Sequence, residues 1–200
     1  MSTPKVSPPR IQAKVWATRY FSGPIARALI ALHISPNAIT VAGFLVVAGG
    51  AYLIAEGELL IGGAVMLGGA AMDMFDGAVA RLSGKASTFG AFLDSVTDRL
   101  GESIVLFGLL VFYVRGADEL GAYLAFGTMV ASYTTSYLRA RAEGLGVPGD
   151  VGFMGRPERV VVLGAGLLLG YEQIALGVIL AVASVTIVQR TAHVWRNADH

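Results

Sequence analysis

The sequence predicts an all-α integral membrane protein with six transmembrane helices, preceded by an N-terminal interfacial amphipathic helix. Of its 200 residues, 54% are hydrophobic and only 14% are charged. The mean hydropathy of +0.64 is typical of membrane helices and not of soluble domains. The apolar residues form six segments, and basic residues gather in every second connection between them, as expected where a chain repeatedly returns to one side of a membrane.

Residues 1–33 are predicted to form a cytoplasmic tail and the interfacial helix. Residues 1–10 contain three prolines and are expected to be loose. Residues 11–32 mix basic with aromatic and aliphatic side chains, a pattern typical of helices that lie in the membrane interface. A break is expected at Ser22, Gly23 and Pro24, with Pro24 opening a second helix. The alternative is a basic flank that only fixes topology.

Residues 34–200 are predicted to form one six-helix membrane domain. A turn begins at Ile34, and Ser35 or Asn37 can cap the helix that follows it. The predicted spans are residues 38–55, 59–81, 89–114, 120–142, 159–170 and 173–194. The fifth span is short unless it extends back toward Gly155.

The distribution of charge predicts the orientation of these helices. Six crossings place both termini on the same side of the membrane. Of the 15 Lys and Arg residues, all except Arg99 and Arg115 fall on that side. Since basic residues favour the cytoplasmic side, we expect a multi-pass protein of the cell (inner) membrane with both termini in the cytoplasm.

Four aspartates interrupt the second and third apolar segments. Asp73 and Asp76 are three residues apart, and Asp94 and Asp98 are four apart, so each pair shares one face of a helix. The short connection between the segments brings the two pairs together at the cytoplasmic end. An unpaired carboxylate at the membrane centre costs roughly 2.5–3.5 kcal/mol, and Arg99 alone cannot balance four. The sequence therefore predicts a site for two divalent cations.

The residue types at this site indicate phosphoryl transfer. Carboxylate oxygens without cysteine or histidine suit hard cations such as Mg²⁺ or Mn²⁺. Paired metals of this kind clamp the attacking and leaving oxygens of a phosphoryl group. Gly77 leaves room for a phosphate or base at the backbone, and Arg81 is placed to reach it. Glu102 continues the stripe at a further four-residue step and is expected to lie behind the metal ligands or to pack against Arg99, with a role as a further metal ligand as the alternative.

The aspartate motif resembles the complete signature of the CDP-alcohol phosphotransferase family. The resemblance is carried by Asp73-x2-Asp76-Gly77-x2-Ala80-Arg81-x8-Gly90-x3-Asp94-x3-Asp98. Members are six-helix membrane enzymes, commonly homodimers, that transfer a phosphatidyl-type group from a CDP-linked lipid to a hydroxyl and release CMP. The resemblance implies that all four aspartates serve the metals, with Asp98 as general base. It implies CDP-lipid contacts at Asn37, Ala38, Ile39, Thr40, Gly77, Ala80, Arg81 and Ser87.

The acceptor is indicated by a second, looser resemblance. Residues 136–143, 156–159 and 189–190 are similar to the branch of that family that joins CDP-diacylglycerol to inositol 1-phosphate. Two positions depart from that branch, since Arg139 stands where lysine is more usual and Gly155 where an acid is usual. A dianionic phosphate would use two or three arginines as bidentate partners. The candidates are Arg139, Arg141, Arg156, Arg159 and Arg190.

Several alternatives stay open or are excluded at this point. Glycerol 3-phosphate is another small anionic acceptor, and the arginines can instead serve topology alone. Intramembrane carboxylates also mark cation or proton transporters, although those favour the midplane and often repeat in both halves of a chain. The sequence contains no P-loop and no basic–aromatic pattern for nucleic acid, and without cysteine it can form no disulfide.

Overall fold

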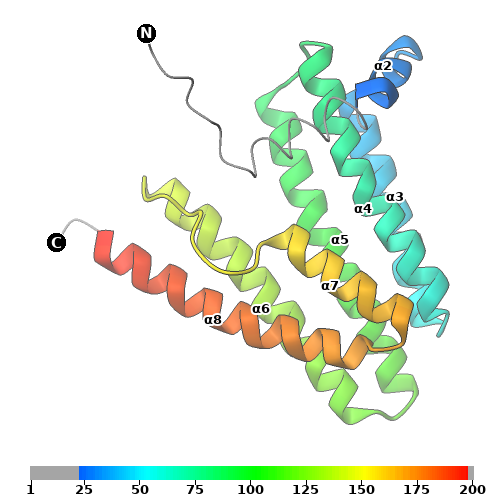
Figure 1. The fold of residues 1–200 in the computed structure, drawn as a ribbon, viewed down its shortest axis with the longest axis vertical. Coiled ribbons are helices and arrows are strands. Elements are labelled where there is room, and N and C mark those ends of the chain that lie inside the picture. The colour runs from blue at the N-terminus through cyan, green and yellow to red at the C-terminus, as the bar shows by residue number, and fades with distance from the viewer. Residues whose placement is uncertain (1–22, 198–200) are drawn as a thin grey trace, which may run out of the picture.

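The computed structural model describes residues 23–197, and that part of the chain forms seven α-helices and no β-strand (Figure 1). The predictions for residues 1–22, which include the tail and the first half of the interfacial helix, lie outside the described residues. The helices are α2 (Gly23–Ala31), α3 (Pro36–Ala55), α4 (Leu59–Leu82), α5 (Thr88–Arg115), α6 (Glu119–Gly144), α7 (Arg156–Leu169) and α8 (Glu172–Asn197).

Helix α2 occupies the position of the predicted second half of the interfacial helix. It begins at Gly23, and Pro24 takes the next position, where its missing N–H costs no helical hydrogen bond. The helix packs against α4. Its position in a membrane interface stays a prediction.

Helices α3 to α8 lie at the six predicted segments, and their first residues follow from local capping. Helix α3 begins after Ser35, whose hydroxyl accepts a hydrogen bond from the backbone N–H of Ala38. Helix α7 begins at Arg156, three residues before the predicted start, because the Glu158 carboxylate accepts a hydrogen bond from the Gly155 N–H at 3.0 Å. Even so, its 14 residues span only about 21 Å.

Three of these helices are long and apolar enough to cross a membrane, judged by length and composition. They are α3, α4 and α8. The all-helical fold is therefore confirmed for the described residues, while the crossing of all six helices stays a prediction.

Glycines let the first helices approach closely. A Cβ at Gly50 of α3 would lie 2.8 Å from the backbone nitrogen of Met66 and 2.9 Å from the carbonyl oxygen of Gly62, both in α4. Helix α3 also packs on α5, whereas α6 packs on α5 and α8, and α7 lies against α4 and α8 (Figure 1). The bundle thus has two parts, α3–α4–α5 and α6–α7–α8, joined through α5–α6 and α4–α7.

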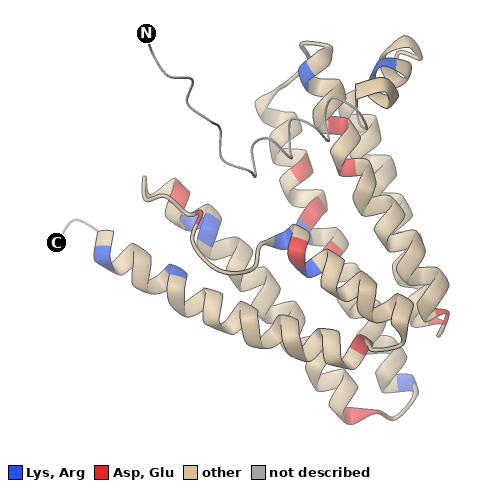
Figure 2. Cartoon of the chain, in the orientation of Figure 1, with Lys and Arg blue, Asp and Glu red and all other residues tan. Residues whose placement is uncertain are grey.

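The connection before α7 opens one end of the bundle. Helices α3, α5 and α7 all begin at the end where α4 and α6 finish, and we call this the site end. Residues 145–155 lead from α6 into α7, whose first residue is level with the third turn of α5, since Arg156 contacts Asp98. Figure 2 shows acidic positions along α4 and α5 in this part of the bundle and basic positions at the start of α7. The short α7 therefore leaves space between α5, α6 and α8 at the site end.

Candidate active site

Three of the four predicted aspartates converge between α4 and α5. One carboxylate oxygen from each of Asp73, Asp76 and Asp94 lies within 4.8 Å of the others. Asp73 and Asp76 share one face of α4 near its end, and Asp94 lies in the second turn of α5. The hairpin predicted from the spacing therefore brings these side chains together.

Asp98 joins this group through a guanidinium. The Nη1 atom of Arg156 lies 2.8 Å from Asp73 Oδ2 and also contacts Asp98 Oδ1. Asp98 lies one turn further along α5 than Asp94, on the same face. Arg156, at the first residue of α7, thus links the carboxylate proposed as the base to a carboxylate of the cluster.

Thr40 of α3 holds the most buried carboxylate of the cluster. Its hydroxyl donates to Asp76 Oδ2 at 2.6 Å, and only 4% of Thr40 and 6% of Asp76 are exposed. The hydroxyl also lies 3.2 Å from the carbonyl oxygen of Pro36, one turn earlier in α3. A short hydrogen bond to a buried carboxylate fixes its orientation. Thr40 was predicted to contact the nucleotide, and its hydroxyl is engaged by a predicted metal ligand.

The donor set fits a hard divalent cation. Asp73, Asp76 and Asp94 offer only oxygen ligands, and their negative charges are partly shielded from solvent. Such a group requires nearby positive charge, because partly buried carboxylates repel one another. These three residues would hold a cation; the sequence predicts two cations and includes Asp98 among the metal-binding residues.

A cavity of about 610 Å³ lies beside the cluster, between α3, α4 and α5. Its walls include Asp76 and Asp94. They also include six of the eight predicted CDP-contact residues, namely Asn37, Thr40, Gly77, Ala80, Arg81 and Ser87. The cavity is therefore the candidate nucleotide pocket.

Two predicted CDP contacts do not line this pocket. Ala38 faces away and is exposed, whereas Ile39 is buried in a small core cluster with residues of α2 and α4. Lys85, which is not among the predicted CDP contacts, also lines the pocket. The backbone at Gly77 is covered by the Arg81 guanidinium, since a Cβ at residue 77 would lie 3.2 Å from Arg81 Nη1.

A second and larger cavity opens on the other side of Asp98. It has a volume of about 1370 Å³ and lies between α5, α6, α7, α8 and the 145–155 connection. Four of the five predicted acceptor arginines line it, namely Arg139, Arg156, Arg159 and Arg190. Arg141 is exposed and is not part of this lining. Arg99, which the sequence analysis did not assign to the acceptor, lines the cavity next to Asp98.

The arginines on α6 and α8 shape the outer wall of this cavity. Arg139 Nε lies 3.0 Å from Glu143 Oε1, and its Nη1 lies 3.8 Å from Asp150 in the connection. Arg190 is 7% exposed; its Nε donates to the Val151 carbonyl at 2.7 Å and its Nη1 to the Thr135 carbonyl. Arg190 therefore ties the connection to α6, while Arg139 remains half exposed at the opening.

Arg159 lies at the floor of the same cavity in a buried ion pair. It is 2% exposed, and its Nε and Nη2 lie 2.6 and 2.8 Å from the two oxygens of Glu102. Glu102 was expected to lie behind the metal ligands or against Arg99. Instead, both of its carboxylate oxygens accept hydrogen bonds from Arg159. Sequence spacing could place Glu102 on the aspartate face of α5, but nothing local indicated a partner 57 residues away.

The fold and the site together define an all-helical membrane protein with a carboxylate metal centre between two cavities, one of them rich in arginine. The chain belongs to the CDP-alcohol phosphatidyltransferase family, whose sequence profile matches residues 33–189.

Relatives with assigned names support this membership. The chain is 39% identical over 185 residues to phosphatidylinositol phosphate synthase of Mycobacterium tuberculosis, covering 86% of this chain and 84% of that protein. It is 36% identical over 184 residues to archaetidylinositol phosphate synthase of Methanothermobacter thermautotrophicus, covering 89% and 90%.

Solved structures share the fold. The crystal structure of the Mycobacterium tuberculosis phosphatidylinositol phosphate synthase with CDP-DAG bound matches with a TM-score of 0.82 and 32% identity, over 88% of this chain and 94% of that one. A structure of the same enzyme in complex with manganese and citrate also has a TM-score of 0.82, at 32% identity over 88% and 89% of the chains. Together with the aspartate cluster, this relationship supports the use of a divalent metal.

Proposed function

We propose that this protein transfers the phosphatidyl group from CDP-diacylglycerol to inositol 1-phosphate, forming phosphatidylinositol phosphate and releasing CMP. The observation that carries the proposal is the position of the aspartates, which lie between a cavity lined by predicted CDP contacts and a cavity lined by four predicted acceptor arginines. The names of the relatives agree with this reaction.

The CDP-lipid would occupy the pocket between α3, α4 and α5. Arg81 supplies a guanidinium at the wall of this pocket for a phosphate or the base, and the missing side chain at Gly77 leaves room for that guanidinium against the α4 backbone. Two divalent cations, Mg²⁺ or Mn²⁺, would be held by Asp73, Asp76, Asp94 and Asp98. When bound, they supply charge stabilisation for the phosphates in the transition state.

The acceptor would bind in the arginine-lined cavity, with its phosphate facing Arg139, Arg156, Arg159 and Arg190. Its hydroxyl would lie at Asp98, which is exposed to this cavity. Asp98 Oδ takes the hydroxyl proton as the oxygen attacks the phosphorus that carries the diacylglycerol. The bond from that phosphorus to the CMP oxygen breaks, and CMP leaves with the electron pair.

The acceptor cavity favours an anion over a neutral alcohol. Its lining carries five arginines (Arg99, Arg139, Arg156, Arg159 and Arg190) against four acids (Asp98, Glu143, Asp150 and Glu158). Asp98 would also be one of the carboxylates that hold the cations, and the positive charge of those cations would add to that of the arginines in favour of an anionic acceptor.

The same proposal includes the finer membrane arrangement. We expect all of α3 to α8 to cross the cell (inner) membrane, with the site end and both termini on the cytoplasmic side. The family resemblance further predicts a homodimer. Accessibility of single cysteines introduced at residues 57 and 146 would test the orientation, because the natural chain contains no cysteine. Chemical cross-linking in native membranes would test the homodimer.

Turnover by the purified full-length protein tests the reaction. CDP-diacylglycerol and Mn²⁺ or Mg²⁺ are supplied with inositol 1-phosphate, glycerol 3-phosphate or unphosphorylated inositol, and CMP release is measured. We expect CMP release only when inositol 1-phosphate is the acceptor, and we expect EDTA to abolish this release. Release with glycerol 3-phosphate and none with inositol 1-phosphate would reassign the acceptor. If CMP were released as efficiently with inositol as with inositol 1-phosphate, the arginines would have no role in binding an acceptor phosphate.

A further inference from the structure

Two carboxylate–guanidinium pairs are stacked between α5 and α7. Asp98 contacts Arg156, and one turn deeper Glu102 contacts Arg159. Both helices begin at the site end, so the two acids and the two arginines descend in the same direction. The four side chains therefore form two rungs, with the first at the reaction centre and the second beneath it.

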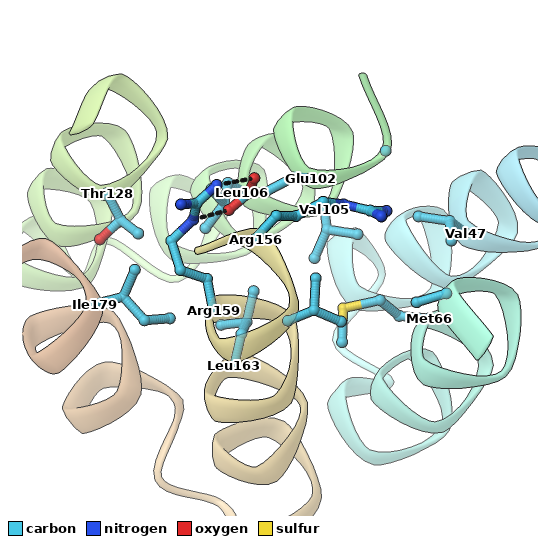
Figure 3. A pocket seen from close by; sticks show the side chains of 13 residues that line it. Val47, Met66, Glu102, Val105, Leu106, Thr128, Arg156, Arg159, Leu163 and Ile179 are labelled. Carbon is cyan, nitrogen blue, oxygen red and sulfur yellow. Dashed lines mark hydrogen bonds and ion pairs between the residues drawn. The ribbon is translucent and has the colours of Figure 1, made fainter. Parts of the chain in front are cut away.

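These rungs cross a gap that the helix backbones leave open. Helix α7 packs mainly on α4 and α8, and α5 packs on α3 and α6. Between α5 and α7 lies a narrow gap, lined mostly by apolar side chains such as Val105, Leu106 and Leu163 (Figure 3). Glu102 and Arg159 meet at this gap, whereas the Arg156 side chain extends toward α3. The lower rung is thus a direct polar contact between α5 and α7, one turn below Asp98.

Arg159 depends on Glu102 for its charge balance. Besides the two contacts to Glu102, its Nη1 lies 3.2 Å from Thr135 Oγ1 and its Nη2 lies 3.3 Å from Ser136 Oγ, and neither hydroxyl carries charge. A guanidinium that is only 2% exposed requires a carboxylate partner, since an unpaired buried charge is strongly unfavourable. The next carboxylate on this face of α5 is Asp98, four residues and about 6 Å away along the helix axis.

We propose that Glu102 is a positioning residue that holds Arg159 at the floor of the acceptor cavity and away from Asp98. With Glu102 in place, the guanidinium that contacts Asp98 is that of Arg156, the first residue of α7. Without Glu102, Arg159 turns to Asp98 as the nearest remaining carboxylate. The proposed base and the neighbouring metal-binding oxygens then face a second, buried cation. This inference rests on the proposed function for its effect on turnover, but not for its effect on cation binding.

Direct measurement of Mn²⁺ binding tests the inference. Mn²⁺ is titrated into the full-length protein in detergent, and free Mn²⁺ is followed by electron paramagnetic resonance. In Glu102→Gln, we expect affinity for Mn²⁺ to fall about ten-fold, because an added cation near carboxylates opposes metal binding. In the double variant Glu102→Gln/Arg159→Gln, the Arg159 guanidinium is also removed, and the affinity for Mn²⁺ should return close to that of the unaltered protein.

A matched control is available at the opposite end of the bundle. Glu56 forms an exposed ion pair with Arg115, the last residue of α5, at 3.0 Å. Glu56→Gln removes the same type of charge and should leave Mn²⁺ affinity and turnover unchanged. If Glu102→Gln does not fold, Glu102→Asp replaces it, because the shorter acid loosens its hold on Arg159 and should give a smaller but measurable loss of affinity.

Turnover separates positioning from a purely structural role. Glu102→Gln should lower kcat. The double variant should recover kcat, but its KM for inositol 1-phosphate should be higher than that of the unaltered protein, since Arg159 is absent from the cavity. Unchanged Mn²⁺ affinity on loss of Glu102, or a loss that Arg159→Gln does not reverse, would overturn the inference. If the unaltered protein released no CMP, the proposed function would fail, while the Mn²⁺ titrations would still decide the role of Glu102.

Discussion

Replacing Thr40 by valine tests whether the orientation of Asp76 controls the metal centre. Valine has the shape of threonine but cannot donate the 2.6 Å hydrogen bond to Asp76 Oδ2. Both residues line the candidate nucleotide pocket but are only 4% and 6% exposed, so water has little access to the place of the lost hydroxyl. The substitution therefore removes one directional contact and leaves the packing of α3 against α4 nearly unchanged.

The size of the effect follows from the type of bond. A hydrogen bond to a buried charged group contributes about 1.5–3 kcal/mol. Loss of a residue that orients a metal ligand typically lowers metal affinity or activity roughly ten- to a hundred-fold. We expect Thr40→Val to weaken Mn²⁺ binding and to lower kcat by factors in this range, because the freed carboxylate rotates out of the cluster.

Two further variants isolate the hydroxyl. Thr40→Ser keeps the donor and should retain most of the affinity. Thr186 is also fully buried, but its hydroxyl donates to the Val182 carbonyl of its own helix, so Thr186→Val controls for loss of a buried hydroxyl elsewhere. Mn²⁺ titration and CMP release are measured for each variant. Wild-type affinity and turnover in Thr40→Val would show that Asp76 needs no such support.

Three other predictions concern the base, the acceptor and the packing. Asp98→Asn should abolish CMP release while Mn²⁺ still binds, because Asp73, Asp76 and Asp94 keep their oxygens; turnover comparable to the unaltered enzyme would exclude Asp98 as the base. Arg139→Ala should raise the KM for inositol 1-phosphate several-fold and leave the KM for CDP-diacylglycerol unchanged. An unchanged KM for inositol 1-phosphate would mean that Arg139 serves only the membrane topology of the chain. Gly50→Ala should lower the melting temperature in detergent by several degrees, since the new Cβ would lie 2.8 Å from a backbone nitrogen of α4. An added methyl in such a contact costs about 1–3 kcal/mol, and an unchanged melting temperature would mean that the two helices can separate freely at that point.

Local features of the sequence predicted much of the fold and the centre of the site. Apolar segment length placed α3 to α8, and the three-residue and four-residue spacings brought Asp73, Asp76 and Asp94 into one cluster. Helix α7 begins three residues before the predicted span, which is the extension toward Gly155 that the sequence left open, and the capping contact between Glu158 and the Gly155 N–H fixes that start.

Long-range pairing was beyond the reach of local patterns. The sequence offered five arginines on the site end as candidates for the acceptor phosphate, yet Arg159 is buried against Glu102, Arg190 donates to backbone carbonyls, and Arg141 is exposed outside the cavity. Which arginine finds a carboxylate depends on how four helices approach one another, and no spacing within a single helix encodes that. The same reason explains why Arg99 and Lys85 were not assigned to the cavities that they line.

The two cavities on opposite sides of the aspartates have a kinetic consequence. In the proposed reaction the CDP-lipid would occupy the cavity between α3, α4 and α5, and the acceptor would occupy the cavity between α5, α6, α7 and α8, so that both would be bound at the same time. The phosphatidyl group would then pass directly from one to the other, with no covalent enzyme adduct. Initial-rate plots for the two substrates should therefore intersect rather than run parallel, and a nonreactive CDP analogue should not compete with the acceptor.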